Sequence, residues 1–521
     1  MKTQVLIIGG GATGTGLARD LALRGLQCLL VEKKDINAGA SGGNHGLLHS
    51  GARYVASDPE AARECREEGE LLKHLAPHCI EKTGGLFVAV EGDDEDYIAR
   101  FPGLCEKAGV PARALDLKEA RLLEPALSKK LIAAYAVEDG SIDPFRLSLD
   151  NLAQAGEHGA DLLCFTRVAA FEIGNSKIQS VKLENTLSGE SLSVEADIII
   201  NAAGAWAGLV AGLAGLSVPV LYSKGSLIIT QERMNHRVIN RLRPASNADI
   251  LVPGGTVSIL GTTSIRIEHP DHAYPTVEEI EIMIEDAKAM IPALETARYI
   301  RAYCGVRPLV GSPGGGEDRK VTRGFVLLDH SAQGLNNFIT ITGGKLTTFR
   351  LMAEKTADLV CDHLGLIRPC LTRTEPLPAS SSVRWTEPAG APRVWLTGHD
   401  PQDTVLCECE MVPRSAIDSI VDALKNQGIK ADLLAIGLRS RIGKGRCQGS
   451  FCAPRIAASL YQQGEMSASQ TIDGLREFIR NRWKGLQPVL WGDQLAQAEL
   501  SEAVHCGFLG LEGEEGENGR V

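Results

Sequence analysis

The chain has 521 residues, room for about three domains of ordinary size, and its 44% hydrophobic and 23% charged residues match soluble globular proteins. This composition excludes collagen-like, coiled-coil and wholly disordered chains. The formal net charge is −11, so no overall basic field draws the chain to nucleic acid, and an anionic substrate needs a local group of cations. The thirteen cysteines are an odd number scattered without the symmetry of a disulfide framework, and the first residues lack a signal-peptide layout, which indicates a reducing cytoplasm.

The N-terminal segment has the pattern of a dinucleotide-binding turn. An apolar strand leads into Gly9-Gly-Gly11-Ala-Thr-Gly14, a helix is expected over 17–24, and a strand over 27–31 ends before Glu32. In G-x-G-x-x-G the first glycine makes the turn, the second lets the backbone approach a pyrophosphate, and the third allows close helix packing. Glu32 stands where a carboxylate accepts a hydrogen bond from an adenosine ribose. The pattern predicts a dinucleotide site, the alternative being a purely structural glycine turn, and does not separate FAD from NAD.

Two sheet patterns alternate further along the chain. Helical patterns occur at 60–75, 94–108 and 150–158, and apolar–polar alternation at 161–196 and 227–263 is typical of small antiparallel sheets. Residues 198–221 carry no charge, but glycine and alanine dominate and a strand leads into a turn, so we predict no transmembrane span. These patterns indicate an α/β protein with a discontinuous two-domain body.

Four cysteines after a Pro- and Ser-rich linker form two close pairs. Cys407 and Cys409 are followed, after 37 intervening residues, by Cys447 and Cys452. Four thiolates suit a [2Fe–2S] cluster or a structural zinc ion, and reduced cysteines without metal are the remaining alternative. A cluster takes one electron at a time, nicotinamide gives up a hydride, and a flavin converts between the two. Together the two motifs favour FAD over NAD, unless the cysteines hold zinc.

Several longer strings carry a family resemblance. They are G-G-G-A-T-G-T-G at the start, G-N-H-G-L-L-H-S-G-A-R-Y from Gly43, D-G-S-I-D-P-F-R-L from Asp139, N-A-A-G-A-W from Asn201, K-G-S-L from Lys224, G-V-R-P-L from Gly305, I-T-G-G-K-L-T-T-F-R from Ile341, then C-E-C, R-C-Q-G-S-F-C and R-W-K-G. With these strings the chain resembles, nearly end to end, the catalytic A subunits of anaerobic, respiratory glycerol-3-phosphate dehydrogenases. The body is similar to FAD-dependent glycerol-3-phosphate dehydrogenases and D-amino-acid-oxidase-like enzymes, and the tail resembles the [2Fe–2S] domain of bacterioferritin-associated ferredoxin.

The resemblance implies an α/β fold in which a Rossmann-like FAD-binding domain is interleaved with an antiparallel-sheet substrate domain. A small, separately folded α-helical [2Fe–2S] domain follows. The expected parts are an FAD-binding domain at 1–75, 145–215 and 325–370, a substrate domain at 76–144 and 216–324, a linker at 371–403, a [2Fe–2S] domain at 404–500 and an acidic tail at 501–521.

The implied reaction oxidises sn-glycerol 3-phosphate to dihydroxyacetone phosphate and reduces FAD. Electrons then pass through the [2Fe–2S] centre to a second flavoprotein-type subunit, next to a membrane-anchoring iron–sulfur subunit, and finally to a quinone. Whether a partner subunit holds an FMN is left open. The chain is expected at the cytoplasmic face of the inner membrane as a peripheral protein, soluble without its partners. Arg476–Trp491 interleaves cations with aromatics, as in a contact with anionic lipid or a partner protein, or at the edge of a helical domain.

The resemblance also assigns site residues. The expected cofactor-binding residues are Gly9, Gly11, Gly14, Glu32, Gly42, His45, Val168, Gly204, Gly343, Gly344 and Thr347; the expected catalytic residues are Arg53, Tyr54, His49, Arg307 and Lys345; the expected metal ligands are Cys407, Cys409, Cys447 and Cys452. Arg53 and Arg307 suit a phosphate, Tyr54 adds a hydrogen bond, and Lys345 stabilises charge near the flavin or the C2 oxygen. Each cation alone is also explained as a surface charge, and each histidine by packing.

Two departures from the family pattern leave questions open. Aerobic relatives have a histidine where this chain has Leu227, so the proton acceptor is not assigned between His45 and His49. The second cysteine pair is not the C-x-x-C of the ferredoxin-type relative, so iron ligation is an expectation. The alternative functions are an FAD-dependent dehydrogenase of an L-2-hydroxyacid or amino acid, and a non-catalytic electron-transfer subunit.

Overall fold

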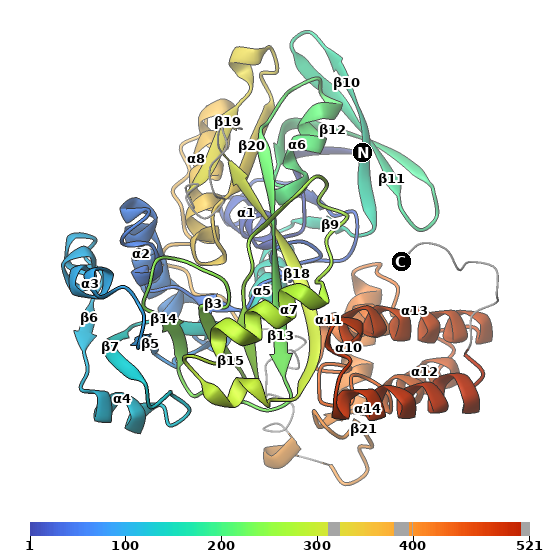
Figure 1. The fold of residues 1–521 in the computed structure, drawn as a ribbon. Coiled ribbons are helices and arrows are strands. Elements are labelled where there is room, and N and C mark those ends of the chain that lie inside the picture. Colours follow the sequence, from blue (N-terminus) through green and yellow to red (C-terminus); the bar gives the residue numbers. More distant parts are fainter. Residues whose placement is uncertain (311–323, 380–394, 399, 512–521) are drawn as a thin grey trace.

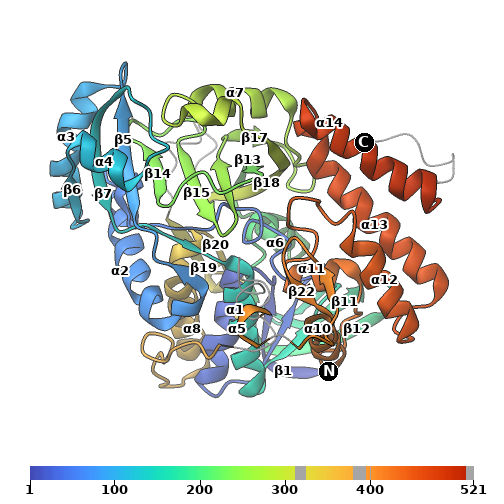
Figure 2. The same cartoon turned by 90° about the horizontal axis from the view of Figure 1, so that it is seen from below.

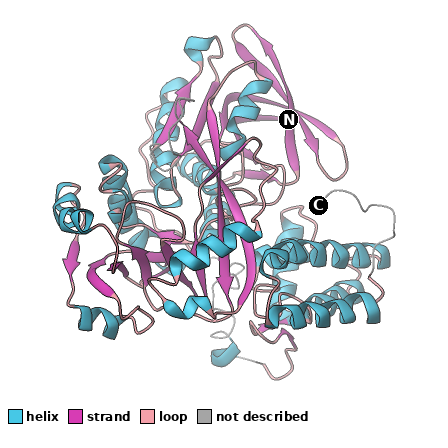
Figure 3. Ribbon diagram, viewed as in Figure 1, coloured by secondary structure: helices cyan, strands magenta, loops and turns pink. Residues whose placement is uncertain are grey.

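The computed structural model describes residues 1–310, 324–379, 395–398 and 400–511. These residues form two large sheets in the body of the molecule and a helical C-terminal unit beside it (Figure 1). Figure 3 shows the strands concentrated in the body and the C-terminal unit built almost entirely of helices.

The first sheet has eight strands and carries the N-terminal glycine turn. Its order is β10-β11-β12-β1-β2-β9, with β20 beside β12 and β19 beside β20. The strands are β1 Lys2–Ile8, β2 Cys28–Val31, β9 Asp161–Leu163, β10 Thr166–Gly174, β11 Lys177–Asn185, β12 Ser191–Asn201, β19 Phe325–Asp329 and β20 Phe338–Gly343. Because β1 runs parallel to β2 and β12, and β12 parallel to β20, the carboxyl ends of these strands meet at one edge, where open α/β sheets bind ligands.

Alternate residues of β1 bury opposite faces of this sheet. Val5 and Ile7 pack in a core with three helices, whereas Leu6 and Ile8 pack in a second core on the other face. The helices are α1 Ala12–Leu23, α5 Pro144–Glu157 and α8 Phe349–Leu364 on the first face, and α6 Ala207–Leu213 on the second. With no polar position in Val5–Ile8, this strand is buried on both faces and fixed in the middle of the sheet.

The second sheet has nine strands in the order β17-β13-β16-β15-β14-β5-β7-β6, with β18 on the long strand β13. The strands are β5 Gly85–Val90, β6 Ala112–Ala114, β7 Leu131–Val137, β13 Val220–Thr230, β14 Val238–Arg241, β15 Ile250–Gly254, β16 Val257–Gly261, β17 Ile265–Ile267 and β18 Tyr299–Val310. The pairing is antiparallel except between β14 and β5. Other elements of the body are α2 Pro59–Leu75, α3 Glu95–Lys107, α4 Leu117–Leu123, α7 Val277–Ala287 and a small sheet of β3 Leu47–Leu48, β4 Ile80–Glu81 and β8 Gly140–Ile142.

The C-terminal unit lies along one side of the body (Figure 2). Its elements are β21 Val405–Cys407, β22 Val412–Pro413, α10 Arg414–Asn426, α11 Leu433–Arg439, α12 Cys452–Gln462, α13 Ala468–Leu486, α14 Asp493–Glu502 and a π-helical turn, Ala503–Phe508. It has an apolar core of its own, but Cys164 of the body belongs to that core, and Arg439 pairs with Asp35 at 2.8 Å. The unit therefore packs against the body, here beside the first sheet and through α13 against β18 of the second.

Several expected boundaries differ from the structure. The first helix begins at Ala12, directly after the glycine turn, instead of at residue 17, and α5 begins at Pro144 instead of at residue 150. Asp143 caps α5 by accepting hydrogen bonds from Phe145 N and Arg146 N at 2.9 and 3.1 Å, which is why the helix starts there. The stretch 161–196 is antiparallel in β10 and β11, but β9 pairs in parallel with β2.

The apolar stretch 198–221 is divided between the end of β12, the short helix α6 and the start of β13. Among the described residues, no helix is long and apolar enough to cross a bilayer. Much of the expected linker, 380–394 and residue 399, lies outside the described residues, and its first part folds onto the body, where Leu377 N donates to Leu75 O at 2.7 Å. Helical structure continues to Phe508, past residue 500 where the tail was expected to begin, and 512–521 are not described.

Candidate active site and cysteine site

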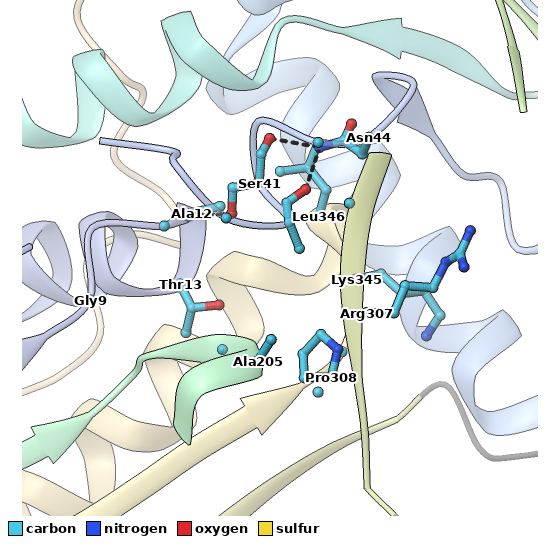
Figure 4. Close-up of a pocket in the computed structure, with 18 of the residues that line it drawn as sticks. Gly9, Ala12, Thr13, Ser41, Asn44, Ala205, Arg307, Pro308, Lys345 and Leu346 are labelled. Atoms are coloured by element: carbon cyan, nitrogen blue, oxygen red, sulfur yellow. Dashed lines mark hydrogen bonds between the residues drawn. The ribbon is translucent and has the colours of Figure 1, made fainter. Parts of the chain in front are cut away.

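A cavity of about 590 Å³ lies between the two sheets. Its walls come from the carboxyl ends of β1, β2 and β12, from the loop 38–54, and from β13, β16 and β18 of the second sheet. Figure 4 shows the glycine turn at one side of this cavity and Arg307 and Lys345 at the opposite side. The fold therefore joins a phosphate-binding turn and a cationic region in one space.

The glycine turn leaves the first helix open toward the cavity. Gly9 has φ +117°, and a Cβ there would lie 2.6 Å from the carbonyl oxygen of Ala202, directly after β12. A Cβ at Gly14 would overlap the carbonyl of Gly9, so the third glycine lets the helix close on the turn. Gly11 caps α1 without a side chain and the first turn holds no acidic residue, so the positive end of the helix is suited to an anion. Ser41 Oγ accepts from Ala12 N at 2.9 Å and fixes the loop above (Figure 4).

Glu32 follows β2 at the same edge of the sheet. Its carboxylate accepts hydrogen bonds from Gly10 N at 2.7 Å and Lys34 N at 2.9 Å. Burial raises the pKa of Glu32, against the lowering effect of these two bonds. A carboxylate has lone pairs beyond those two, so the group can still accept from a ribose hydroxyl. Val168 and Gly204 also line the cavity.

An ion pair between Asp271, which follows β17 of the second sheet, and Lys33, which follows β2 of the first, lies over this part of the cavity. Neither residue belongs to a recognisable sequence motif. Asp271 accepts hydrogen bonds from Trp206 Nε1 at 2.9 Å and Lys33 Nζ at 3.2 Å, and the Lys33 ammonium lies 4.2 Å from the centre of the Trp206 ring. Burial alone would raise the pKa of Asp271, but the bonds from Lys33 and Trp206 and the lysine charge lower it. All three side chains line the cavity, so Asp271 ties the two sheets together across it.

Arg307 lies directly over Gly225 of the neighbouring strand β13. A Cβ at Gly225 would come within 2.6 Å of the guanidinium carbon, so only glycine leaves room for this arrangement. The guanidinium donates to the carbonyl of Thr263 at 3.2 Å and to the hydroxyl of Thr262. Lys345 places its ammonium 4.9 Å from the centre of the Tyr54 ring.

Arg53 is held differently. It forms an ion pair with Asp249 and donates to Arg241 O at 3.2 Å, and the Arg53 and Asp249 side chains are only 9% and 1% exposed. Burial would raise the pKa of Asp249, but the charges of Arg53 and Arg243 hold it below its usual range. The charge of Arg53 is thus partly neutralised by Asp249, which lies 196 residues further along the chain. No local sequence pattern predicts this pair.

His45 lies beside Leu227 of β13. A Cβ at Gly261 would lie 3.1 Å from Leu227 Cδ2 and 3.5 Å from His45 Cδ2, so both side chains cover this glycine. Burial and the charges of Arg307 and Arg53 lower the pKa of His45 to about 3, so its imidazole is neutral. Its Nδ1 is buried and has no hydrogen-bond partner within the described residues. By contrast, His49 Nε2 lies 3.3 Å from the hydroxyl of Tyr54.

The cavity brings together most residues expected from the sequence. Those that line it are Gly9, Gly11, Glu32, His45, His49, Arg53, Tyr54, Val168, Gly204, Arg307, Gly343, Gly344 and Lys345. Gly14, Gly42 and Thr347 do not line it. Gly42 lies within the loop 38–54, where a Cβ would overlap the Asn37 carbonyl, and the buried Thr347 accepts a hydrogen bond from His49 N at 3.2 Å. Gly42 and Thr347 therefore hold this loop in place.

The four cysteines of the C-terminal unit also come together. The Sγ atoms of Cys407 and Cys409, and those of Cys409 and Cys447, are 3.8 Å apart, and Cys407 hydrogen-bonds Cys452. Bonds from Cys407 and Cys447 lower the pKa of Cys409 to about 3, which favours a thiolate. Among the described residues, no three of these sulfurs all lie within 4.8 Å of one another. The thiols thus form an extended group, not a compact tetrahedron.

Comparison with known proteins identifies the family. The profile of the family described as DAO, FAD dependent oxidoreductase, matches residues 4–359. The chain belongs to this FAD-dependent oxidoreductase family. It is 44% identical to the A subunit of the anaerobic glycerol-3-phosphate dehydrogenase of Escherichia coli K12, over 99% of this chain and 98% of that protein. It is 40% identical to the A1 subunit of the Haloferax volcanii enzyme, over 97% and 90%. The expected resemblance to the A subunits of anaerobic glycerol-3-phosphate dehydrogenases and to FAD-dependent oxidoreductases is confirmed.

Solved structures show the same fold in other flavoproteins. The glycerol-3-phosphate dehydrogenase of Bacillus halodurans, solved in complex with FAD, superposes with a TM-score of 0.63 at 20% identity over 94% of this chain and 96% of that one. The L-proline dehydrogenase of P. horikoshii superposes with a TM-score of 0.58 at 25% identity over 75% and 98%. The expected α/β fold with an FAD-binding part is therefore confirmed.

The residues of this member of the FAD-dependent family fit the cofactor. The glycine turn has no side chain to block a pyrophosphate, Glu32 presents an acceptor for a ribose, and Gly343 and Gly344, with φ of +88° and +69°, bring bare backbone to the cavity wall. Replacing either Gly9 or Gly344 would drive a side chain into a neighbouring atom. The cavity is thus built for a long ligand that approaches the backbone closely.

Proposed function

We propose that this protein oxidises sn-glycerol 3-phosphate at C2 to dihydroxyacetone phosphate with FAD as the acceptor. One observation carries the proposal: a dinucleotide turn and three cations, Arg53, Arg307 and Lys345, open into a single cavity. The relatives named glycerol-3-phosphate dehydrogenase match this chain over nearly its whole length, which supports the choice of substrate.

Gly9, Gly11 and the start of α1 would hold the pyrophosphate of FAD, Glu32 its ribose, and Gly343 and Gly344 its ring system. When bound, FAD supplies the acceptor for the hydride that leaves C2 of the substrate. Asp271, through its contacts with Lys33 and Trp206, would then hold the cofactor in place.

The cations position the substrate through its phosphate. Arg307 has a planar guanidinium whose geometry is fixed by Thr262, Thr263 and the missing side chain of Gly225. Such a fixed fork suits a phosphate dianion, and Lys345 adds a second charge. Because Arg53 is paired with Asp249, we assign it mainly to the electrostatic potential of the site and not to direct binding of the phosphate. Holding the phosphate fixes where C2 lies, which is the larger part of the catalytic task.

His45 is our choice for the proton acceptor. Its buried Nδ1 has no hydrogen-bond partner among the described residues and can accept the proton of the C2 hydroxyl. Burial and the charges of Arg307 and Arg53 lower the pKa of His45, so proton transfer to it requires the substrate phosphate to offset those charges. His49 is already engaged with the hydroxyl of Tyr54. In this arrangement His45 takes the place of the histidine that aerobic relatives carry at position 227.

We further propose that the four cysteines bind a [2Fe–2S] cluster. A single zinc ion, with Zn–S bonds of about 2.3 Å, needs all four sulfurs mutually within about 4 Å, whereas here they are spread in a chain. An elongated set of four thiolates would suit two irons, with each thiolate bound to one of them. The electrons would leave through a second flavoprotein-type subunit, with any FMN that it holds, and a membrane-anchoring iron–sulfur subunit to quinone at the cytoplasmic face of the membrane. The relatives are named as the A subunits of their enzymes, which supports partner subunits.

The test is an anaerobic titration of the purified chain with sn-glycerol 3-phosphate, in which flavin absorbance is followed first and iron–sulfur EPR is then recorded on the same sample. We expect bleaching with glycerol 3-phosphate and none with 2-hydroxyglutarate. Bleaching by the hydroxyacid alone would refute the substrate, and absence of iron in anaerobically prepared protein would refute the cluster.

The same assay tests His45. We expect His45→Gln to slow flavin bleaching by about 10²- to 10⁴-fold, the usual contribution of a positioned base. His158→Gln, at the exposed end of α5, serves as the control and should bleach at the parent rate. An unchanged rate in His45→Gln would move the role to His49.

A further inference from the structure

Three cations lie in the region where the C-terminal unit packs against the second sheet. Arg482 belongs to α13, Arg301 to β18, on which α13 packs, and Lys444 to the loop before Cys447. Arg301 reaches across α13 at Gly485, one turn after Arg482, where a Cβ would lie 2.7 Å from Arg301 Nε. This glycine lets the two arginines approach the same place from the two sides of the docking surface.

None of these three cations forms an ion pair with a carboxylate among the described residues. In the described part of the chain, Arg301, Arg482 and Lys444 have no carboxylate oxygen within 4.0 Å, whereas their neighbour Arg441 is paired with Glu410 at 3.1 Å. Arg482 Nε is buried without a hydrogen-bond partner among the described residues. Burial lowers the pKa of Arg482 and brings that of Lys444 to about 7. Uncompensated cations are costly in such a place unless an anion joins them.

Arg482 lies against the backbone that contacts the cysteines. A Cβ at Gly443 would lie 3.1 Å from Arg482 Nη2, and the Gly443 backbone hydrogen-bonds Cys452. The guanidinium is held over the ring of Phe478, 5.0 Å from its centre. Gly443 thus lies between Arg482 and Cys452, and Arg482 Nε has no hydrogen-bond partner in the described part of the chain.

We propose that Arg482, backed by Arg301, balances the negative charge of the cysteine-bound cluster and sets its reduction potential. This inference rests on the [2Fe–2S] cluster of the proposed function. Four thiolates, two sulfides and two ferric ions carry two negative charges, and one electron from the reduced flavin, which converts one iron to the ferrous form, makes three. A fixed cation nearby stabilises the reduced state more than the oxidised state, and so raises the potential.

The geometry separates Arg482 from the other cations of the region. Lys444 places its ammonium 4.9 Å from the centre of the Phe145 ring, so it faces the body. Arg441 is neutralised by Glu410. Arg480, two residues before Arg482 on α13, is exposed and lies 3.7 Å from Glu477, which makes it a matched control.

The experiment is an EPR redox titration of the full chain, prepared anaerobically, with iron and sulfide measured in every sample. We expect Arg482→Met to keep its iron while the reduction equilibrium of the cluster shifts at least tenfold toward the oxidised form, which is 59 mV for a one-electron couple. Arg482→Lys should recover most of the shift, because it keeps the charge, and Arg480→Gln should match the parent.

The outcomes are distinguishable from failure of the proposed function. Arg482→Met with full iron and an unchanged potential would overturn the inference and leave the dehydrogenase and its cluster standing. Absence of iron in the parent protein would overturn the cluster itself. If Arg482→Met does not fold, Arg301→Met carries the test: a shift in the same direction supports the inference, and an unchanged potential overturns it.

Discussion

Gly225 is the position where a single methyl group should reveal what Arg307 does. In Gly225→Ala the new Cβ would lie 2.6 Å from both Cζ and Nη1 of Arg307, well inside the contact distance of about 3.5 Å, so the guanidinium must move by about 1 Å. Its bonds to Thr262 and Thr263 then no longer fix its direction. A hydrogen bond to a charged group contributes about 1.5–3 kcal/mol, so we expect kcat/KM for glycerol 3-phosphate to fall by about 10- to 160-fold.

The assay is steady-state oxidation of glycerol 3-phosphate with an artificial acceptor, with FAD content measured for each sample. Gly156→Ala, whose Cβ would meet nothing within 4 Å, is the matched control and should leave kcat/KM unchanged. Arg307→Lys should resemble Gly225→Ala, because an ammonium cannot present a fork. If Gly225→Ala retains FAD and the parent kcat/KM, Arg307 does not position the substrate and our assignment of the anion site is wrong.

Three further predictions follow from other contacts. Asp271→Asn should speed FAD release by up to about fivefold, because a half-exposed ion pair contributes at most about 1 kcal/mol. The increase in FAD fluorescence after dilution measures the release rate, and an unchanged rate would show that Asp271 does not help to hold the cofactor. The pKa of His45 is lower in the folded protein, about 3, than in the unfolded chain, so stability should fall below pH 6.5 by about 1.4 kcal/mol per pH unit; His45→Gln should flatten that part of the stability profile, and a parent-like slope would contradict the burial argument. Cys452→Ser should lose iron but keep FAD, and iron retained at the parent level would exclude it as a ligand.

The N-terminal turn was predictable because its physics is local. Gly9, Gly11 and Gly14 are required by close backbone approaches within a few residues, and Glu32 follows from the length of one helix and one strand. The start of α5 is also encoded locally, because Asp143 caps the helix and Pro144 opens it six residues before the helical pattern expected at 150–158. Parallel pairing of β9 with β2 depends on distant partners and leaves no such mark.

The candidate site divides along the same line. Residues inside motifs, such as Arg307 and Lys345, were found because the strings that hold them are distinctive. Asp249 and Asp271 were missed because their partners lie far away along the chain, and neither stands in a motif. Similarly, the role proposed for Arg482 depends on the absence of a carboxylate near it among the described residues, which only the folded arrangement reveals.

The strand β18 has a consequence for how this chain can change in length. Alternate residues of a strand share one face, and here these are Arg301, Tyr303, Gly305 and Arg307. Arg301 contacts the C-terminal unit, the Tyr303 hydroxyl donates to the Asn44 carbonyl at 2.7 Å, Gly305 packs on the loop 38–54, and Arg307 lines the cavity. Six residues of strand span about 20 Å. A single inserted or deleted residue between Arg301 and Arg307 would turn one of these arginines to the opposite face of the sheet. The number of residues in this stretch is therefore fixed as long as Arg301 and Arg307 keep their places at its two ends.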